Sequence, residues 1–172
     1  MTQPKIDQRL IWDYYKPRQT HSWNMVCLAL NTLEQLDPAE GLRFEAEYCW
    51  ENLIIRLWLH RTTVRTLTKI DRIAASARDA VKRFDAQFAM NGRNGLKALR
   101  DMIEHFDDYA AGNGRGPGQR ETDLDPWRSF TKDYYERGGF RLERVKSFDA
   151  IVALQRDAKM ASDDLIGWLN SP

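Results

Sequence analysis

The chain has 172 residues, 42% of them hydrophobic and 11% aromatic, so it is long enough to bury a core without metal ions or disulfide bonds. Its 26 basic and 25 acidic residues nearly cancel, which excludes a general attraction to nucleic acids or membranes and leaves only a local patch for binding a polyanion. The N-terminus lacks the apolar stretch of a signal peptide, and no segment is long and apolar enough to span a bilayer. We therefore expect one cytoplasmic domain over residues 1–172.

Apolar residues at helical spacing begin in the first third of the chain. They predict a first helix over residues 22–36, with Ser22 or Thr20 as its N-cap. Both cysteines, Cys27 and Cys49, lie within such apolar patterns. We expect them to be small buried hydrophobic residues rather than a disulfide or a metal pair.

Two further helices are expected in the middle of the chain. The second starts with Asp37 as its N-cap, and its apolar stripe continues to Leu67. The third covers residues 73–88 and stops at Asn91–Gly92. The pattern leaves open whether these two helices are continuous near residues 68–76.

The last third of the chain changes in character. A fourth helix is expected from about Asn94 to Ala111, and a glycine-rich loop follows it. Aromatic and branched residues around Gly138–Gly139 predict a short β-hairpin near 128–146, with a helix as the alternative. A final helix is capped by Ser147. The predicted fold is mostly all-α, a bundle of four to five helices with this short hairpin.

The fourth helix carries the residues that point most directly to chemistry. Arg100 and Asp101 precede His105, one of only three histidines in the chain. At about 100° per residue, His105 lies off the apolar face and about 40° from Asp101, whose carboxylate is suited to orient the imidazole. Arg100 lies about 140° from His105, so the two converge only through the long arginine side chain or across a twofold axis.

A purely structural interpretation competes with this one. Arg100, Glu104 and Asp107 have the spacing of ordinary surface ion pairs, with His105 as a solvated neighbour and the acidic run simply exposed to water.

A metal site is a further alternative, because His105 and Asp108 are three residues apart. The other histidines do not extend it. His60 occupies a core position and is expected to be a buried, hydrogen-bonded structural residue, and His21 is expected at the surface.

The segment "RDMIEH", Arg100 to His105, resembles the R-x4–6-H motif of the HEPN superfamily. In the commonest form of that motif a polar residue follows the arginine, and here Asp101 stands in that position. A late helix of a small helical bundle is also the setting in which the family carries the motif.

The resemblance implies a metal-independent endoribonuclease that acts as a homodimer, often the toxin of a toxin–antitoxin or phage-defence system with a cognate antitoxin. It implies that His105 acts as general base or acid at the ribose 2′-hydroxyl and the leaving oxygen. Arg100 would stabilise charge on the phosphate, and Asp101 would fix the imidazole. No cofactor is implied.

The chain also departs from the family pattern. Some HEPN toxins carry a tyrosine two residues after the histidine, where this chain has Asp107, with Tyr109 two residues further on. Many family members are non-catalytic dimeric interaction modules, which is the first alternative function. A metal-dependent helical-bundle hydrolase is the second.

Basic residues near the motif suggest a local surface for binding RNA. Arg93 and Lys97 precede it, and Arg115 lies in the following glycine-rich loop, where the backbone can approach a phosphate closely. Scattered solvated cations are the alternative interpretation.

Overall fold

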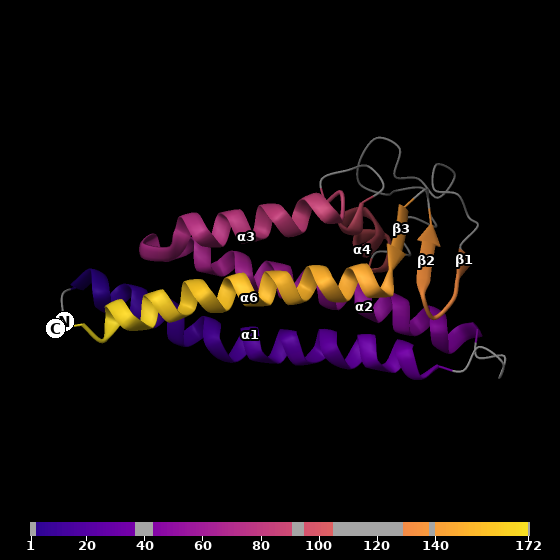
Figure 1. Ribbon diagram of the computed structural model, residues 1–172, viewed down its shortest axis with the longest axis horizontal. Helices are drawn as coiled ribbons and strands as arrows, with labels where there is room; N and C mark the ends of the chain where they lie inside the picture. Colours follow the sequence, from indigo (N-terminus) through magenta and orange to yellow (C-terminus); the bar gives the residue numbers. More distant parts are fainter. Residues whose placement is uncertain (1–2, 37–42, 91–94, 105–128, 138–139, 172) are drawn as a thin grey trace.

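The structure is a computed structural model that describes residues 3–36, 43–90, 95–104, 129–137 and 140–171. Within these residues the chain forms five α-helices and a three-stranded antiparallel sheet, which confirms the predicted mostly helical bundle with a short hairpin. The long helices lie along one axis and the sheet sits at one end of the bundle (Figure 1). None of the helices in these ranges is both long and apolar enough to cross a membrane.

The first helix, α1, spans Gln3–Gln35 and begins far earlier than predicted. Its buried face continues toward the N-terminus at helical spacing, through Tyr15 and Trp12. The predicted N-caps are therefore wrong. Ser22 and Thr20 lie inside the helix, where their hydroxyls donate to carbonyl oxygens three and four residues earlier.

The second and third predicted helices are not continuous. Helix α2, described over Arg43–Arg65, is followed by two short 3₁₀ turns, Thr66–Lys69 and Asp71–Ile73. Between these turns Ile70 is extended, with φ −100° and ψ 103°. The chain therefore reverses, and α3 (Ala74–Gln87) runs back along the bundle (Figure 1).

Helix α3 ends in a tight turn that leads to the shorter helix α4 (Leu96–Glu104). Ala89 adopts a left-handed conformation, with φ 44°, and the Met90 N–H donates to the Asp85 carbonyl at 3.0 Å. This is the bond of a Schellman motif, in which the left-handed position is usually glycine. Outside the described residues lie the predicted helix start at Asp37, the stop at Asn91–Gly92 and the helix end near Ala111.

The hairpin predicted near 128–146 is confirmed, and it belongs to a sheet of order β1-β2-β3. The strands are β1 (Ser129–Phe130), β2 (Tyr134–Arg137) and β3 (Phe140–Glu143). Tyr135 is fully buried and pairs with Leu142 on the neighbouring strand. The buried face of the sheet carries Tyr135 and Leu142 together with the buried side chain of Arg137.

The last helix, α6, spans Arg144–Leu169 and starts directly after the sheet. Its predicted cap is wrong, because Ser147 lies in the first turn and donates to the Glu143 carbonyl at 2.7 Å. The Trp50 Nε1–H donates to the Thr131 carbonyl at 2.6 Å. This hydrogen bond connects α2 to the segment between β1 and β2.

One hydrophobic core joins the helices and the sheet. Its largest fully buried side chains come from α1, α2, α3, α4, β2 and the 3₁₀ turns between α2 and α3. They are Tyr15, Leu33, Trp50, Leu53, Ile54, Leu57, Leu67, Ile70, Ile73, Phe84, Leu96 and Tyr135.

Candidate functional site

Of the residues predicted to form the site, Lys97, Arg100 and Asp101 lie on α4. Its apolar stripe faces the bundle, with Leu96 and Leu99 buried. Lys97 is exposed, whereas Arg100 and Asp101 are partly buried at the edge of the helix. Outside the described residues lie His105, Arg93 and Arg115.

The guanidinium of Arg100 is held by two carboxylates on its own helix. Its Nη1 lies 2.7 Å from Oδ1 of Asp101, and its Nη2 forms an ion pair with Glu104. The pair with Glu104, four residues away, is the one that the surface-pair interpretation expected. The Arg100 Nε is buried and has no hydrogen-bond partner among the described residues.

Asp101 lies between two cations. Its Oδ2 is 2.5 Å from Nζ of Lys97, and its Oδ1 accepts from Arg100. Burial raises the pKa of the Asp101 carboxyl, but the hydrogen bonds and charges of Lys97 and Arg100 outweigh it and hold that pKa below its ordinary value. Asp101 therefore remains ionised at neutral pH. That its carboxylate orients the imidazole of His105 stays a prediction.

Trp58 of α2 links this cluster to the bundle. The guanidinium carbons of Arg61 and Arg100 lie 5.4 Å and 5.5 Å from the centroid of its ring. Arg61 is buried and forms a bidentate pair with Asp85 of α3, with Nε 2.8 Å from Oδ1. The sequence placed Trp58 only in an apolar stripe. It gave no signal for a pair between two helices, because Arg61 and Asp85 are far apart in the chain.

His60 is fully buried and hydrogen-bonded, as predicted. Its Nδ1 lies 2.9 Å from Oγ of Ser22, whose hydroxyl donates to the Gln19 carbonyl at 3.0 Å. Because Ser22 has only one hydroxyl proton, the His60 Nδ1–H is then the donor to Ser22. Burial lowers the pKa of His60 to about 4, so the ring is neutral at pH 7.

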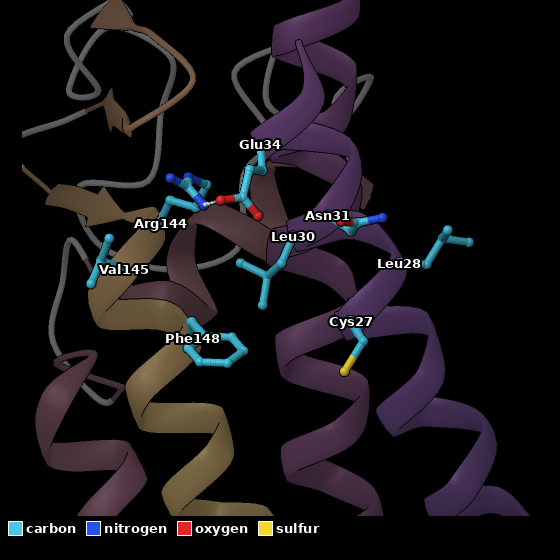
Figure 2. A pocket seen from close by; sticks show the side chains of 8 residues that line it. All are labelled: Cys27, Leu28, Leu30, Asn31, Glu34, Arg144, Val145 and Phe148. Atoms are coloured by element: carbon cyan, nitrogen blue, oxygen red, sulfur yellow. Dashed lines mark ion pairs between the residues drawn. The ribbon is translucent and has the colours of Figure 1, made fainter.

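A groove with a volume of about 630 Å³ lies between α1 and the start of α6. Leu30 and Phe148 give it an apolar lining, and the ion pair of Glu34 with Arg144 lies at one end (Figure 2). Among its described lining residues, only the Cys27 thiol is a nucleophile, and no histidine or second thiol accompanies it.

Among the described residues, no three His, Cys, Asp or Glu side chains gather as metal ligands. Both cysteines have free thiols; Cys49 is buried as expected, whereas Cys27 is only partly buried. Comparison with protein-family models, curated proteins and solved structures finds no match to this chain. A functional assignment therefore depends on the residues themselves.

Proposed function

We propose that this chain is a metal-independent endoribonuclease of HEPN type that acts as a homodimer. Arg100, Asp101 and His105 are its catalytic residues, and Lys97, Arg93 and Arg115 contribute to RNA binding. A toxin of a toxin–antitoxin or phage-defence system, held in check by an antitoxin protein, is the biological role that fits this activity.

The observation that carries the proposal is the fixed guanidinium of Arg100. It is partly exposed at the edge of α4, it is oriented by Asp101 and Trp58, and it begins the Arg-Asp-x3-His string. A preoriented guanidinium stabilises charge that develops on a phosphate without a reorganisation cost during the reaction.

The proposed reaction uses the hydroxyl of the substrate itself. His105 accepts the proton of the ribose 2′-hydroxyl, and the 2′ oxygen attacks the adjacent phosphorus. The bond from phosphorus to the 5′ oxygen breaks, and that oxygen takes a proton from an imidazolium. The products are a 2′,3′-cyclic phosphate and a free 5′-hydroxyl. The RNA strand is therefore the only reactant in this step.

One observation favours a second candidate, a non-catalytic HEPN-type dimeric interaction module. The positive charge of Arg100 is already neutralised by Asp101 and Glu104. A phosphate must displace one of these carboxylates before it reaches the guanidinium, and a module that only binds a partner has no such requirement.

The two candidates differ in one assay. Wild-type protein is incubated with single-stranded RNA in excess chelator, and the ends of the products are identified. We expect cleavage that leaves 2′,3′-cyclic phosphates, loss of cleavage in His105→Ala, and at least a ~100-fold slower rate in Arg100→Gln. Arg78→Gln, an exposed arginine on α3, is the matched control and retains the wild-type rate.

A modified substrate tests whether the ribose 2′-hydroxyl is the attacking group. An oligonucleotide with 2′-deoxyribose at the cleaved position must resist the enzyme, because it lacks the attacking hydroxyl. Equal cleavage by wild type and His105→Ala, with both folded by circular dichroism, would dismiss the catalytic assignment. A dimer that leaves all RNA intact would establish the interaction module instead.

A further inference from the structure

A second hollow, of about 370 Å³, lies between α1 and α2. This volume is in the range of sites for small ligands. Arg18 and His21 reach it from α1 and Arg56 reaches it from α2. The described residues that line this pocket include no carboxylate, so it has a local excess of positive charge in a chain that is nearly neutral overall.

The two arginines of this pocket differ from Arg61 and Arg100, which are paired with acids. Nε of Arg56 donates to Oδ1 of Asn52 at 3.1 Å, and the guanidinium carbon of Arg18 lies 3.8 Å from the centroid of the Tyr14 ring. Within the described chain neither Arg18 nor Arg56 forms an ion pair. Both guanidinium groups are thus oriented by neutral neighbours and keep terminal N–H donors for a ligand.

The hydroxyls in this pocket do not compete as donors. Ser22 donates to the Gln19 carbonyl, and Thr63 donates to the Leu59 carbonyl at 2.9 Å. His60, behind Ser22, is neutral and fully buried, so it adds no charge. Donors to a ligand therefore come from the arginines and His21.

The remaining lining of the pocket is apolar. Pro17, Met25 and Leu59 contribute it, and Leu59 is exposed even though it is a large hydrophobic residue. An apolar wall next to two guanidinium groups matches a ligand that has an anionic end and an apolar body.

We propose that this pocket binds a soluble phosphate monoester with an apolar substituent. A phosphate monoester carries up to two negative charges and three terminal oxygens, which suits two guanidinium groups better than a single carboxylate does. The apolar substituent packs on Leu59. The pocket shares no lining residue with the proposed ribonuclease site, because its described lining belongs to α1 and α2 whereas Arg100 and Asp101 lie on α4.

The test is isothermal titration calorimetry of the full chain at low salt with phenyl phosphate, inorganic phosphate and phenol as probes. We expect phenyl phosphate to bind saturably, with a Kd below about 1 mM. Inorganic phosphate should bind more weakly, and phenol should not bind measurably. Arg56→Gln and Arg18→Gln should each weaken phenyl phosphate binding about tenfold or more, the range of a lost charge-assisted hydrogen bond.

Two controls make the result decisive. Arg78→Gln removes an exposed arginine elsewhere and should leave the affinity unchanged. Arg18 is exposed, so Arg18→Gln keeps the fold even if Arg56→Gln does not. Unchanged affinity in Arg18→Gln, or no saturable binding of phenyl phosphate, would overturn the proposal. Arginine-dependent binding to vesicles containing phosphatidic acid, without binding of phenyl phosphate, would also overturn it by assigning the pocket to a lipid headgroup.

Discussion

Arg100 of α4 lies against Trp58 of α2, with its guanidinium carbon 5.5 Å from the centroid of the indole ring. The contact joins the helix that carries the candidate motif to the long helix at the centre of the bundle. A cation over an indole ring contributes about 0.5–1 kcal/mol at an exposed site and more when it is desolvated. The position of Arg100 is therefore set by the bundle as well as by its own helix.

This contact gives a measurable coupling energy. We expect Trp58→Leu and Arg100→Gln to be non-additive in a double-mutant cycle, with a coupling of about 0.5–1 kcal/mol in the free energy of unfolding. Urea denaturation of the four proteins measures it. The cycle of Arg100→Gln with Tyr14→Leu, whose ring contacts Arg18 instead, should be additive. Additivity in both cycles would show that Trp58 does not hold Arg100.

Arg61 and Asp85 form the most buried ion pair of the described chain, and breaking it should be costly. The Arg61 side chain is only 9% exposed, so Asp85→Asn leaves a buried guanidinium without its counter-ion. We expect a loss of about 3 kcal/mol in the free energy of unfolding. Asp13→Asn breaks the exposed pair with Arg9 and should cost less than about 0.5 kcal/mol. Equal losses in the two variants would contradict the difference in burial.

His60 should make stability depend on pH. In the unfolded chain a histidine takes up a proton near pH 6.5, whereas the pKa of buried His60 is lowered to about 4. Between these values the unfolded state binds more protons, so the free energy of unfolding falls as the pH drops. The lowered pKa of His60 accounts for a loss of about 2 kcal/mol in the free energy of unfolding between pH 7 and pH 5.

The variant His60→Gln tests this dependence. It should be less stable than wild type at pH 7, by about 1 kcal/mol, because the bond to Ser22 is altered. It should nevertheless lose less stability than wild type between pH 7 and pH 5 in urea denaturation. Asn24→Gln, at an exposed residue of α1 that does not titrate, should keep the wild-type pH dependence. An unchanged slope in His60→Gln would refute the assignment of this dependence to His60.

Secondary structure and burial that depend on the local sequence pattern were predictable from the sequence. The stripe through Trp50 and Leu57 fixed α2 as a core helix and placed His60 in its buried face, because burial on a helix repeats with the helical period. Gly138–Gly139, flanked by aromatic and branched residues, indicated the hairpin, because strand and turn preferences depend on residues that are close together in the sequence.

Features that depend on tertiary contacts were not predictable. The N-terminal half of α1 carries Pro17 and many polar residues, and it is helical because Trp12 and Tyr15 are buried in the bundle. Ser147 looked like a cap, but β3 leads directly into α6 and leaves no separate capping turn. At the candidate site, the contact of Arg100 with Trp58 joins two helices and leaves no spacing signal in the chain.

The turn after α3 gives the last prediction, at Ala89. A left-handed conformation costs a residue with a Cβ about 1 kcal/mol, and glycine avoids this cost. Ala89→Gly should therefore raise the free energy of unfolding by about 0.5–1 kcal/mol, even though glycine makes the unfolded chain more flexible.

Gly95 is the matched contrast, because it faces the same turn. A Cβ at Gly95 would overlap the carbonyl oxygen of Ala89, which is backbone and not free to move aside. Gly95→Ala should thus lower the free energy of unfolding by about 2 kcal/mol. Urea denaturation at neutral pH would measure the change in the free energy of unfolding for both variants. A loss of stability in Ala89→Gly would mean that flexibility of the unfolded chain outweighs the strain at φ 44°, and that this turn is held by the burial of Met90 instead.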